Sequence, residues 1–62
     1  MEYEVRITKH CSGETYNVDL ASFDRSGSGM LSGRAFNVSY EDAIAKAEYT
    51  ALSFNAPVIH KY

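Results

Sequence analysis

The 62-residue sequence has few of the features that stabilise or specialise small proteins. It contains one cysteine, one proline and no tryptophan, with six lysines and arginines against eight aspartates and glutamates. A single cysteine cannot form an internal disulfide, which excludes the cross-linked frameworks of small secreted proteins. The net charge of −2 argues against general nucleic-acid binding, because that function requires clustered basic residues.

Long apolar runs are also missing. No stretch approaches the roughly 20 residues of a membrane-spanning helix. The acidic, alternating start at residues 1–4 does not have the pattern of a signal peptide. We therefore expect a cytoplasmic protein. At well under the usual domain size of about 100–200 residues, the chain should form one small domain over residues 1–62, and domains this small are marginally stable.

Alternating apolar and polar residues predict strands in the first part of the chain. Residues 2–10 and 15–23 both alternate, and the turn-forming segment between them predicts a hairpin. Residues 24–33 hold three of the four glycines and allow two interpretations. They form either a ten-residue loop, or a tight turn at residues 26–29 followed by a strand from Met30 that pairs with the second strand.

The clearest helix signal follows. Ser39 and Asp42 have the spacing of a capping box, with aspartate in place of glutamate. From residue 40 to 54, apolar residues recur every three or four positions, which is typical of an amphipathic helix. Pro57 cannot continue a helix, and residues 58–62 resemble a final short strand.

These elements predict an α+β fold of order β-β-β-α-β, with one helix packed on one face of a three- to four-stranded antiparallel sheet. The predicted core consists of the apolar residues that share the inner faces: Tyr3, Val5, Ile7, Tyr16, Val18, Leu20, Phe36, Val38, Ile44, Ala47, Ala51, Phe54 and one of Val58 and Ile59. This core is thin for a monomer, so pairing of a sheet edge into a homodimer is an alternative.

The sequence has no recognisable catalytic constellation, so we expect a protein that is not an enzyme and needs no cofactor. His10, Cys11 and His60 are the only soft metal ligands, and neighbouring strand residues point to opposite faces, which separates His10 from Cys11. The glycine-rich segment lacks both the spacing and the following helix of a phosphate-binding loop.

The remaining unusual feature is a group of apolar and arginine side chains near the glycines. Phe23, Met30 and Leu31 flank the predicted turn, with Arg25 and Arg34 nearby. This composition is typical of protein-contact surfaces, and Tyr49, on the polar side of the helix, is a second candidate anchor. The alternative is that Phe23 and Leu31 cover an edge of the core while Met30 has no role.

One stretch resembles a known class of proteins. The segment Asn37-Val38-Ser39-Tyr40-Glu41-Asp42-Ala43-Ile44-Ala45-Lys46-Ala47-Glu48-Tyr49, followed by a strand at 58–62, is similar to the strand–helix–strand end of small phage-encoded inhibitors, such as the RNA-polymerase inhibitors of podophages. Those inhibitors use basic residues of the closing strand, where only His60 and Lys61 match here. The resemblance implies a small protein that binds and blocks a host machine, a class that includes anti-CRISPR proteins.

We therefore expect a non-enzymatic protein-binding module, encoded by a phage or mobile element, that sterically blocks a larger host protein complex such as RNA polymerase or a CRISPR or other defence complex. The predicted contact residues are Phe23, Arg25, Met30, Leu31, Arg34 and Tyr49. Two alternatives stay open. One is a homodimerising domain of the toxin–antitoxin kind, and the other is a weak single-stranded nucleic-acid binder that uses Arg6 and Lys9 with stacking on Tyr3 or Tyr16.

Overall fold

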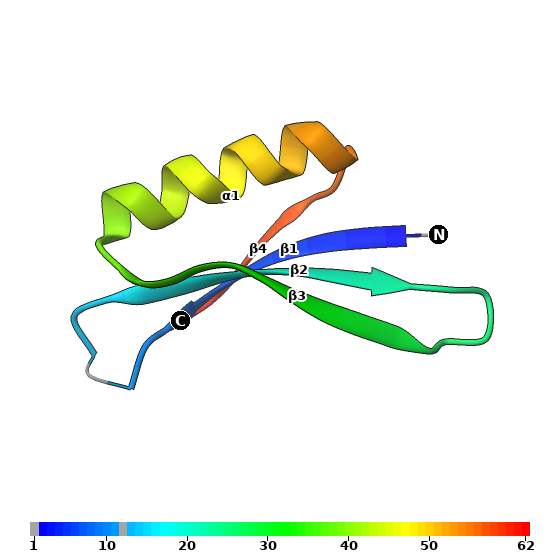
Figure 1. Ribbon diagram of the computed structural model, residues 1–62, viewed down its shortest axis with the longest axis horizontal. Helices are drawn as coiled ribbons and strands as arrows, with labels where there is room; N and C mark the ends of the chain where they lie inside the picture. Colours follow the sequence, from blue (N-terminus) through cyan, green and yellow to red (C-terminus); the bar gives the residue numbers. More distant parts are fainter. Residues whose placement is uncertain (1, 12) are drawn as a thin grey trace.

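The computed structural model describes residues 2–11 and 13–62 of the chain. The elements are β1 (Glu2–Lys9), β2 (Tyr16–Phe23), β3 (Gly29–Val38), α1 (Tyr40–Phe54) and β4 (Val58–Lys61). Figure 1 shows the helix lying across a twisted four-stranded sheet, whose strands have the spatial order β3-β2-β1-β4. The predicted α+β fold and the element order β-β-β-α-β are confirmed.

The sheet is mixed. β1 and β2 pair antiparallel in an unbroken register from Glu2↔Phe23 to Lys9↔Tyr16, and β2 and β3 are also antiparallel. β4 instead runs parallel to β1, with Val5 opposite Val58. The helix returns the chain to its starting end after β3, so β4 must run in the same direction as β3 and β1. The expected antiparallel pairing therefore holds for two of the three ladders between described strands.

The β2–β3 connection is a tight turn, and β3 begins at Gly29. The carboxylate of Asp24 organises this turn by accepting hydrogen bonds from the Ser26 hydroxyl at 2.7 Å, the Ser26 N–H at 3.0 Å and the Ser28 N–H at 3.0 Å. The Ser26 hydroxyl, together with these N–H groups, holds the pKa of the Asp24 carboxyl below its ordinary value. Of the two interpretations of residues 24–33, the tight turn is confirmed.

The second half of β3 is irregular, and this overturns the prediction that Phe36 is a core residue. Val18 pairs with Ala35 and Tyr16 pairs with Val38, so two steps along β2 match three along β3. The extra residue is a β-bulge, which changes the alternation of side chains. Ala35 and Val38 therefore pack against the core, whereas Phe36 points away from it and is 71% exposed.

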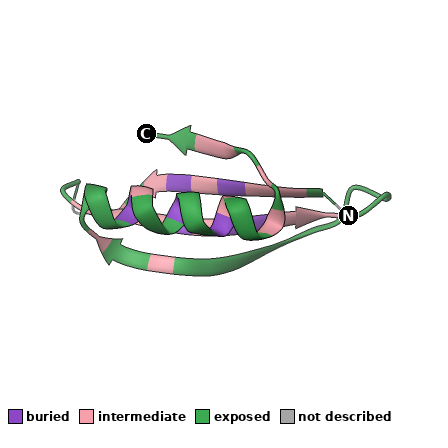
Figure 2. Ribbon diagram, turned by 90° about the horizontal axis from the view of Figure 1, so that it is seen from above, coloured by how far each residue is buried: buried purple, intermediate pink, exposed green. Residues whose placement is uncertain are grey.

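The core lies between the helix and one face of the sheet. Its buried cluster comprises Val5, Ile7, Val18, Leu20, Ala43 and Ala47. Figure 2 shows these buried positions on β1, β2 and the underside of α1, while β3 is exposed along most of its length. The other predicted core residues, Phe36 excepted, pack partly buried around this cluster, and Val58 rather than Ile59 is the member from β4.

Both ends of the helix are capped as their residue types require. The Ser39 hydroxyl accepts a hydrogen bond from the Asp42 N–H at 3.2 Å, as the capping-box spacing predicts. Asn55 ends the helix in the left-handed conformation, with φ of 52°, which asparagine adopts more readily than most residues. The only helix of the described residues is too short and too polar to cross a lipid bilayer.

Candidate protein-binding surface

The helix covers one face of the sheet and leaves the other uncovered (Figure 1). We call this uncovered side the open face. Val5 and Ile7 of β1 pack in the buried cluster with Ala43 and Ala47 of α1. Because strand residues alternate between faces, Glu4 and Arg6 point to the open face. The cross-strand register aligns Glu4, Ala21 and Leu31 in one row of that face. Its apolar residues are Ala21, Phe23, Leu31, Phe36 and Ile59.

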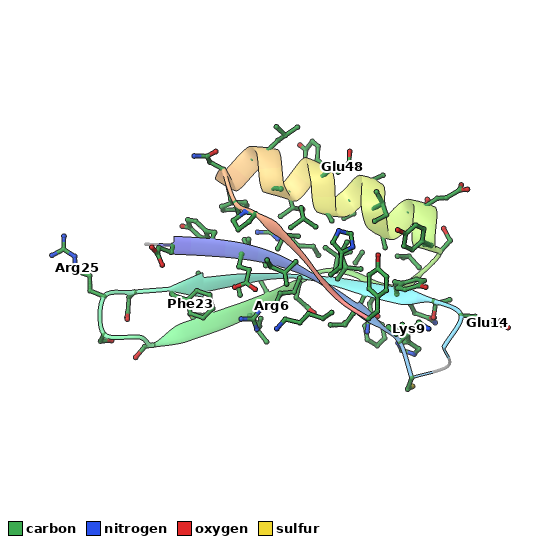
Figure 3. The ribbon with its side chains drawn as sticks, turned by 180° about the vertical axis from the view of Figure 1, so that it is seen from behind. Arg6, Lys9, Glu14, Phe23, Arg25 and Glu48 are labelled. Carbon is green, nitrogen blue, oxygen red and sulfur yellow. The ribbon has the colours of Figure 1, made fainter. Side chains whose placement is uncertain are left out.

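Four of the six predicted contact residues come together at one end of this sheet. The hairpin formed by β2, β3 and their turn extends beyond the C-terminal end of the helix (Figure 1). We call residues 22–31 the hairpin arm. The arm carries Phe23, Arg25, Met30 and Leu31, and Figure 3 shows Arg25 projecting from the turn, away from Phe23 and Arg6.

Phe23 and Leu31 share the open face with Arg6. The Arg6 guanidinium lies 5.6 Å from the centre of the Phe23 ring, and its Nε is 3.2 Å from a Glu4 carboxylate oxygen. Phe23 is half-buried, whereas Leu31 is 62% exposed. A shallow cavity of about 340 Å³ lies between these side chains. Its lining residues are Arg6, Ala21, Phe23, Gly29, Met30 and Leu31.

Met30 points to the opposite side of the arm. It pairs with Ser22, which pairs in turn with Tyr3, and this row faces the side on which the helix lies. The helix ends before it reaches Met30, which is 74% exposed. The side chains of Met30 and Leu31 therefore point to opposite faces of the arm, although both residues contribute to the lining of the cavity. The arm is apolar on both of its faces, with Met30 on one and Leu31 and Phe23 on the other.

The last two predicted contact residues lie off the arm. Arg34 follows the arm on β3, and its guanidinium carbon is 5.2 Å from the centre of the Phe54 ring, so its side chain is directed back toward the helix. Tyr49 lies on the surface of α1 that faces solvent, with the Lys46 ammonium 5.9 Å from its ring centre. Tyr49 and the arm therefore belong to different surfaces of the molecule.

Phe36 and Leu52 are exposed apolar side chains that sequence reasoning did not identify as such. Phe36 was assigned to the core, but it lies beside His10, with the two ring centres 4.8 Å apart in an edge-on arrangement. Leu52 is 85% exposed on the helix. The sequence does indicate that Leu52 is exposed, because this residue falls outside the three- and four-residue spacing of the helix positions that face the core.

An aromatic cluster closes the other end of the molecule, and sequence reasoning did not identify it. The Tyr62 ring lies 5.2 Å from Tyr16 and 6.0 Å from Tyr40, centre to centre. The Tyr62 hydroxyl is 2.7 Å from His60 Nδ1 and donates a hydrogen bond of 3.2 Å to the Tyr40 hydroxyl. These contacts join the end of β4 to the start of α1.

The same contacts alter the ionisation of Tyr62. The hydrogen bond to Tyr40, followed by desolvation and the nearby phenols of Tyr40 and Tyr16, raises the pKa of Tyr62 from 10.0 to about 12. The raised pKa means that the folded state favours the neutral phenol. The stability that this group contributes is fully present below pH 10 and is lost as the pH rises through the folded-state pKa.

This cluster gives a testable prediction. In a spectrophotometric titration at 295 nm, we expect one tyrosine of the folded protein to ionise only near pH 12. Tyr62→Phe should remove this late step, and Tyr40→Phe should move it to lower pH because the hydrogen-bonding partner is lost. Persistence of the late step in Tyr62→Phe would assign it to another residue.

The candidate ligands and stacking residues are dispersed. His10 and His60 contact different aromatic rings, and Cys11 is exposed. Within residues 2–11 and 13–62, no three histidine, cysteine, aspartate or glutamate side chains are grouped so that they could hold a metal ion. Tyr3 and Tyr16, the rings considered for nucleic-acid stacking, are half-buried.

Comparison with known proteins gave no relatives. No protein-family model matches the chain, and no significant match was found among curated proteins or solved structures.

Proposed function

We propose that this chain is a non-enzymatic protein-binding module whose contact surface is the hairpin arm. The observation that carries the proposal is the exposure of Met30 and Leu31, which are 74% and 62% accessible on opposite faces of an arm that extends beyond the helix. Large apolar side chains gathered in this way are typical of protein contacts. The ordered turn at residues 24–28 supports the same function, because a preformed arm loses less conformational entropy on binding.

The two-sided distribution of apolar groups favours a particular mode of binding. A flat partner surface could cover Leu31 and Phe23 or Met30, but not both sides of the arm. A groove in the partner could enclose the arm and bury all three. We propose that the arm inserts into such a groove and that the helix and sheet, which remain outside, block access to it by their bulk.

The resemblance of residues 37–49 to small phage-encoded inhibitors supports a more specific form of this proposal. In that form, the partner is a large host complex, such as RNA polymerase or a CRISPR or other defence complex, and occupation of its groove inhibits it. The net charge of −2 is compatible with a groove that normally holds nucleic acid, because such grooves are positively charged.

The proposal is tested by comparing variants that lose the same kind of side chain at different places. Met30→Ser combined with Leu31→Ser should reduce the capture of a specific partner from host lysate about 100-fold or more, since central apolar anchors carry most of the binding energy. Quantitative mass spectrometry of the captured proteins measures this loss. Circular dichroism should stay unchanged because neither side chain contributes to the buried core.

Leu52→Ser provides the matched control, because Leu52 is 85% exposed on the helix and lies off the arm. Proteins that bind through the arm should be retained by this control and lost by the double variant. Equal capture by the double variant and the control would contradict binding through the arm.

A further inference from the structure

The two edges of the sheet differ in how well they are protected. β4 has four residues, follows Pro57 and ends at Lys61. A short strand flanked by proline and lysine is a common means of preventing edge pairing. β3, at the other edge, has ten residues and is exposed along most of its length (Figure 2). The edge of β3 is therefore the one available for pairing with another strand.

The hydrogen bonds of the turn identify which groups point outward from this edge. The Asp24 N–H donates to the Ser28 carbonyl at 2.9 Å. Asp24 and Ser28 are therefore a hydrogen-bonded pair, and such pairs recur at every second residue along the β2–β3 ladder. In an antiparallel pair, every second residue of a strand directs both its N–H and its C=O toward the partner strand, and the residues between direct both groups away from it. Met30 and Ser32 therefore bond to β2, and the N–H and C=O groups of Gly29, Leu31 and Gly33 point away from the sheet.

The outward residues are symmetric about Leu31. Gly29 and Gly33 flank it at equal distances along the strand, and residues 26–33 carry no charge and no proline. Beyond Gly33, the register of the β2–β3 ladder shifts, and this irregularity ends the straight part of the edge. The segment Gly29–Gly33 therefore has the same pattern of outward groups in both chain directions, so an antiparallel copy would match it without opposing like charges.

We propose that this edge pairs with a second copy of the chain, with a two-fold axis at Leu31. The two Leu31 residues lie opposite each other and exchange backbone hydrogen bonds, and Gly29 of each copy faces Gly33 of the other. On the open face, Leu31 is already aligned with Ala21. The paired sheet then carries a continuous apolar row of Ala21, Leu31, and the same two residues of the second copy in reverse order.

A second copy fits this edge better than an unrelated strand for a reason of symmetry. A two-fold interface presents the same surface on both sides, so it requires a segment that is complementary to itself. Leu31 flanked by two glycines meets that requirement, because the side chain of each Leu31 extends over positions where the other copy has only glycine. The small size of the core also favours association. A chain this short buries only a modest fraction of its apolar surface, and pairing would bury Leu31, which is exposed in a single copy.

The interface is small, and this sets the expected affinity. Five paired residues on each side bury less than the 1,200 Å² or so of a standard stable interface, so the dissociation constant should be on the order of 100 µM. The inference does not rest on the proposed function, because it is measured on the chain in the absence of any partner. Both proposals cover Leu31, so a second copy and a partner groove would exclude each other at this residue.

Sedimentation equilibrium on the purified chain tests the proposal. The wild-type protein should change from monomer to dimer as its concentration increases through about 100 µM. Leu31→Lys and Leu31→Glu should each weaken self-association at least about tenfold, since each places like charges directly opposite one another at the two-fold axis. Leu31 is largely exposed, so both variants should keep the wild-type circular dichroism spectrum.

Mixing the two variants provides the decisive measurement. Leu31→Lys and Leu31→Glu should associate with each other, because the opposite charges now meet at the axis. Leu52→Lys, which places a charge at an exposed apolar position of the helix, should dimerise like the wild type. A wild-type protein that stays monomeric up to about ten times the expected dissociation constant overturns the proposal. A failure of the mixed variants to associate, or a loss of association in Leu52→Lys, also overturns it.

Discussion

Replacement of Ile7 by alanine is expected to unfold a large part of the protein population at room temperature. Ile7 is fully buried between the helix and the sheet, opposite Val18 on β2. Truncation of a buried isoleucine to alanine typically costs about 2–5 kcal/mol, because apolar burial is lost and a cavity remains. A single core in a chain of this size rarely supplies more than about 3–5 kcal/mol of net stability, so one such loss removes most of it.

Urea denaturation followed by circular dichroism measures this effect as a loss of free energy of unfolding. Leu52→Ala is the matched control, because it also truncates an aliphatic side chain but at an exposed position. Its change should stay within about 0.5 kcal/mol. A cost below about 1 kcal/mol for Ile7→Ala would mean that Ile7 is not enclosed by the core as described.

Enlargement of Ala47 to leucine should have the second largest effect. Ala47 is fully buried where α1 crosses the sheet, and with Ala43 it lets the helix backbone lie close to the strands. A leucine at this position has no space unless the helix moves away from the sheet. Overpacking of this kind typically costs about 1–3 kcal/mol, which is a large share of the stability of so small a domain.

Ala45→Leu on the same helix isolates the packing effect. Ala45 is exposed, and leucine is nearly as good a helix former as alanine, so this substitution should change stability by less than about 0.5 kcal/mol. Thermal denaturation of the two variants should therefore give clearly different midpoints. Equal midpoints would contradict close packing of α1 at Ala47.

Local sequence signals predicted most of the fold because the elements obey simple periodicities. The hydroxyl of Ser39 caps the helix at the expected residue, and the alternation of β1 and β2 correctly placed Val5 and Val18 in the core. These signals depend on neighbours within a few positions along the chain, which a sequence shows directly.

Features that depend on distant pairing were harder to predict. Phe36 appeared to continue the alternation of β3, but a bulge opposite Val18 reverses its direction. Met30 and Leu31 were predicted as part of one contact surface, although neighbours on a strand point to opposite faces, and the register with β2 shows which face each of them occupies. The tyrosine cluster around Tyr62 likewise requires the position of β4 beside β1. Neither bulges nor three-dimensional neighbours leave a reliable local signature.

The position of β4 has a consequence for the order in which the protein assembles. Val5 pairs with Val58, 53 positions later in the sequence, whereas the β1–β2 and β2–β3 pairs are closed by short turns. The entropy lost in closing a loop increases with its length, so contacts between distant residues slow folding. We expect the three-stranded meander to form first and the helix to dock on it. β4 then adds to the uncovered edge of β1 as the final step of folding.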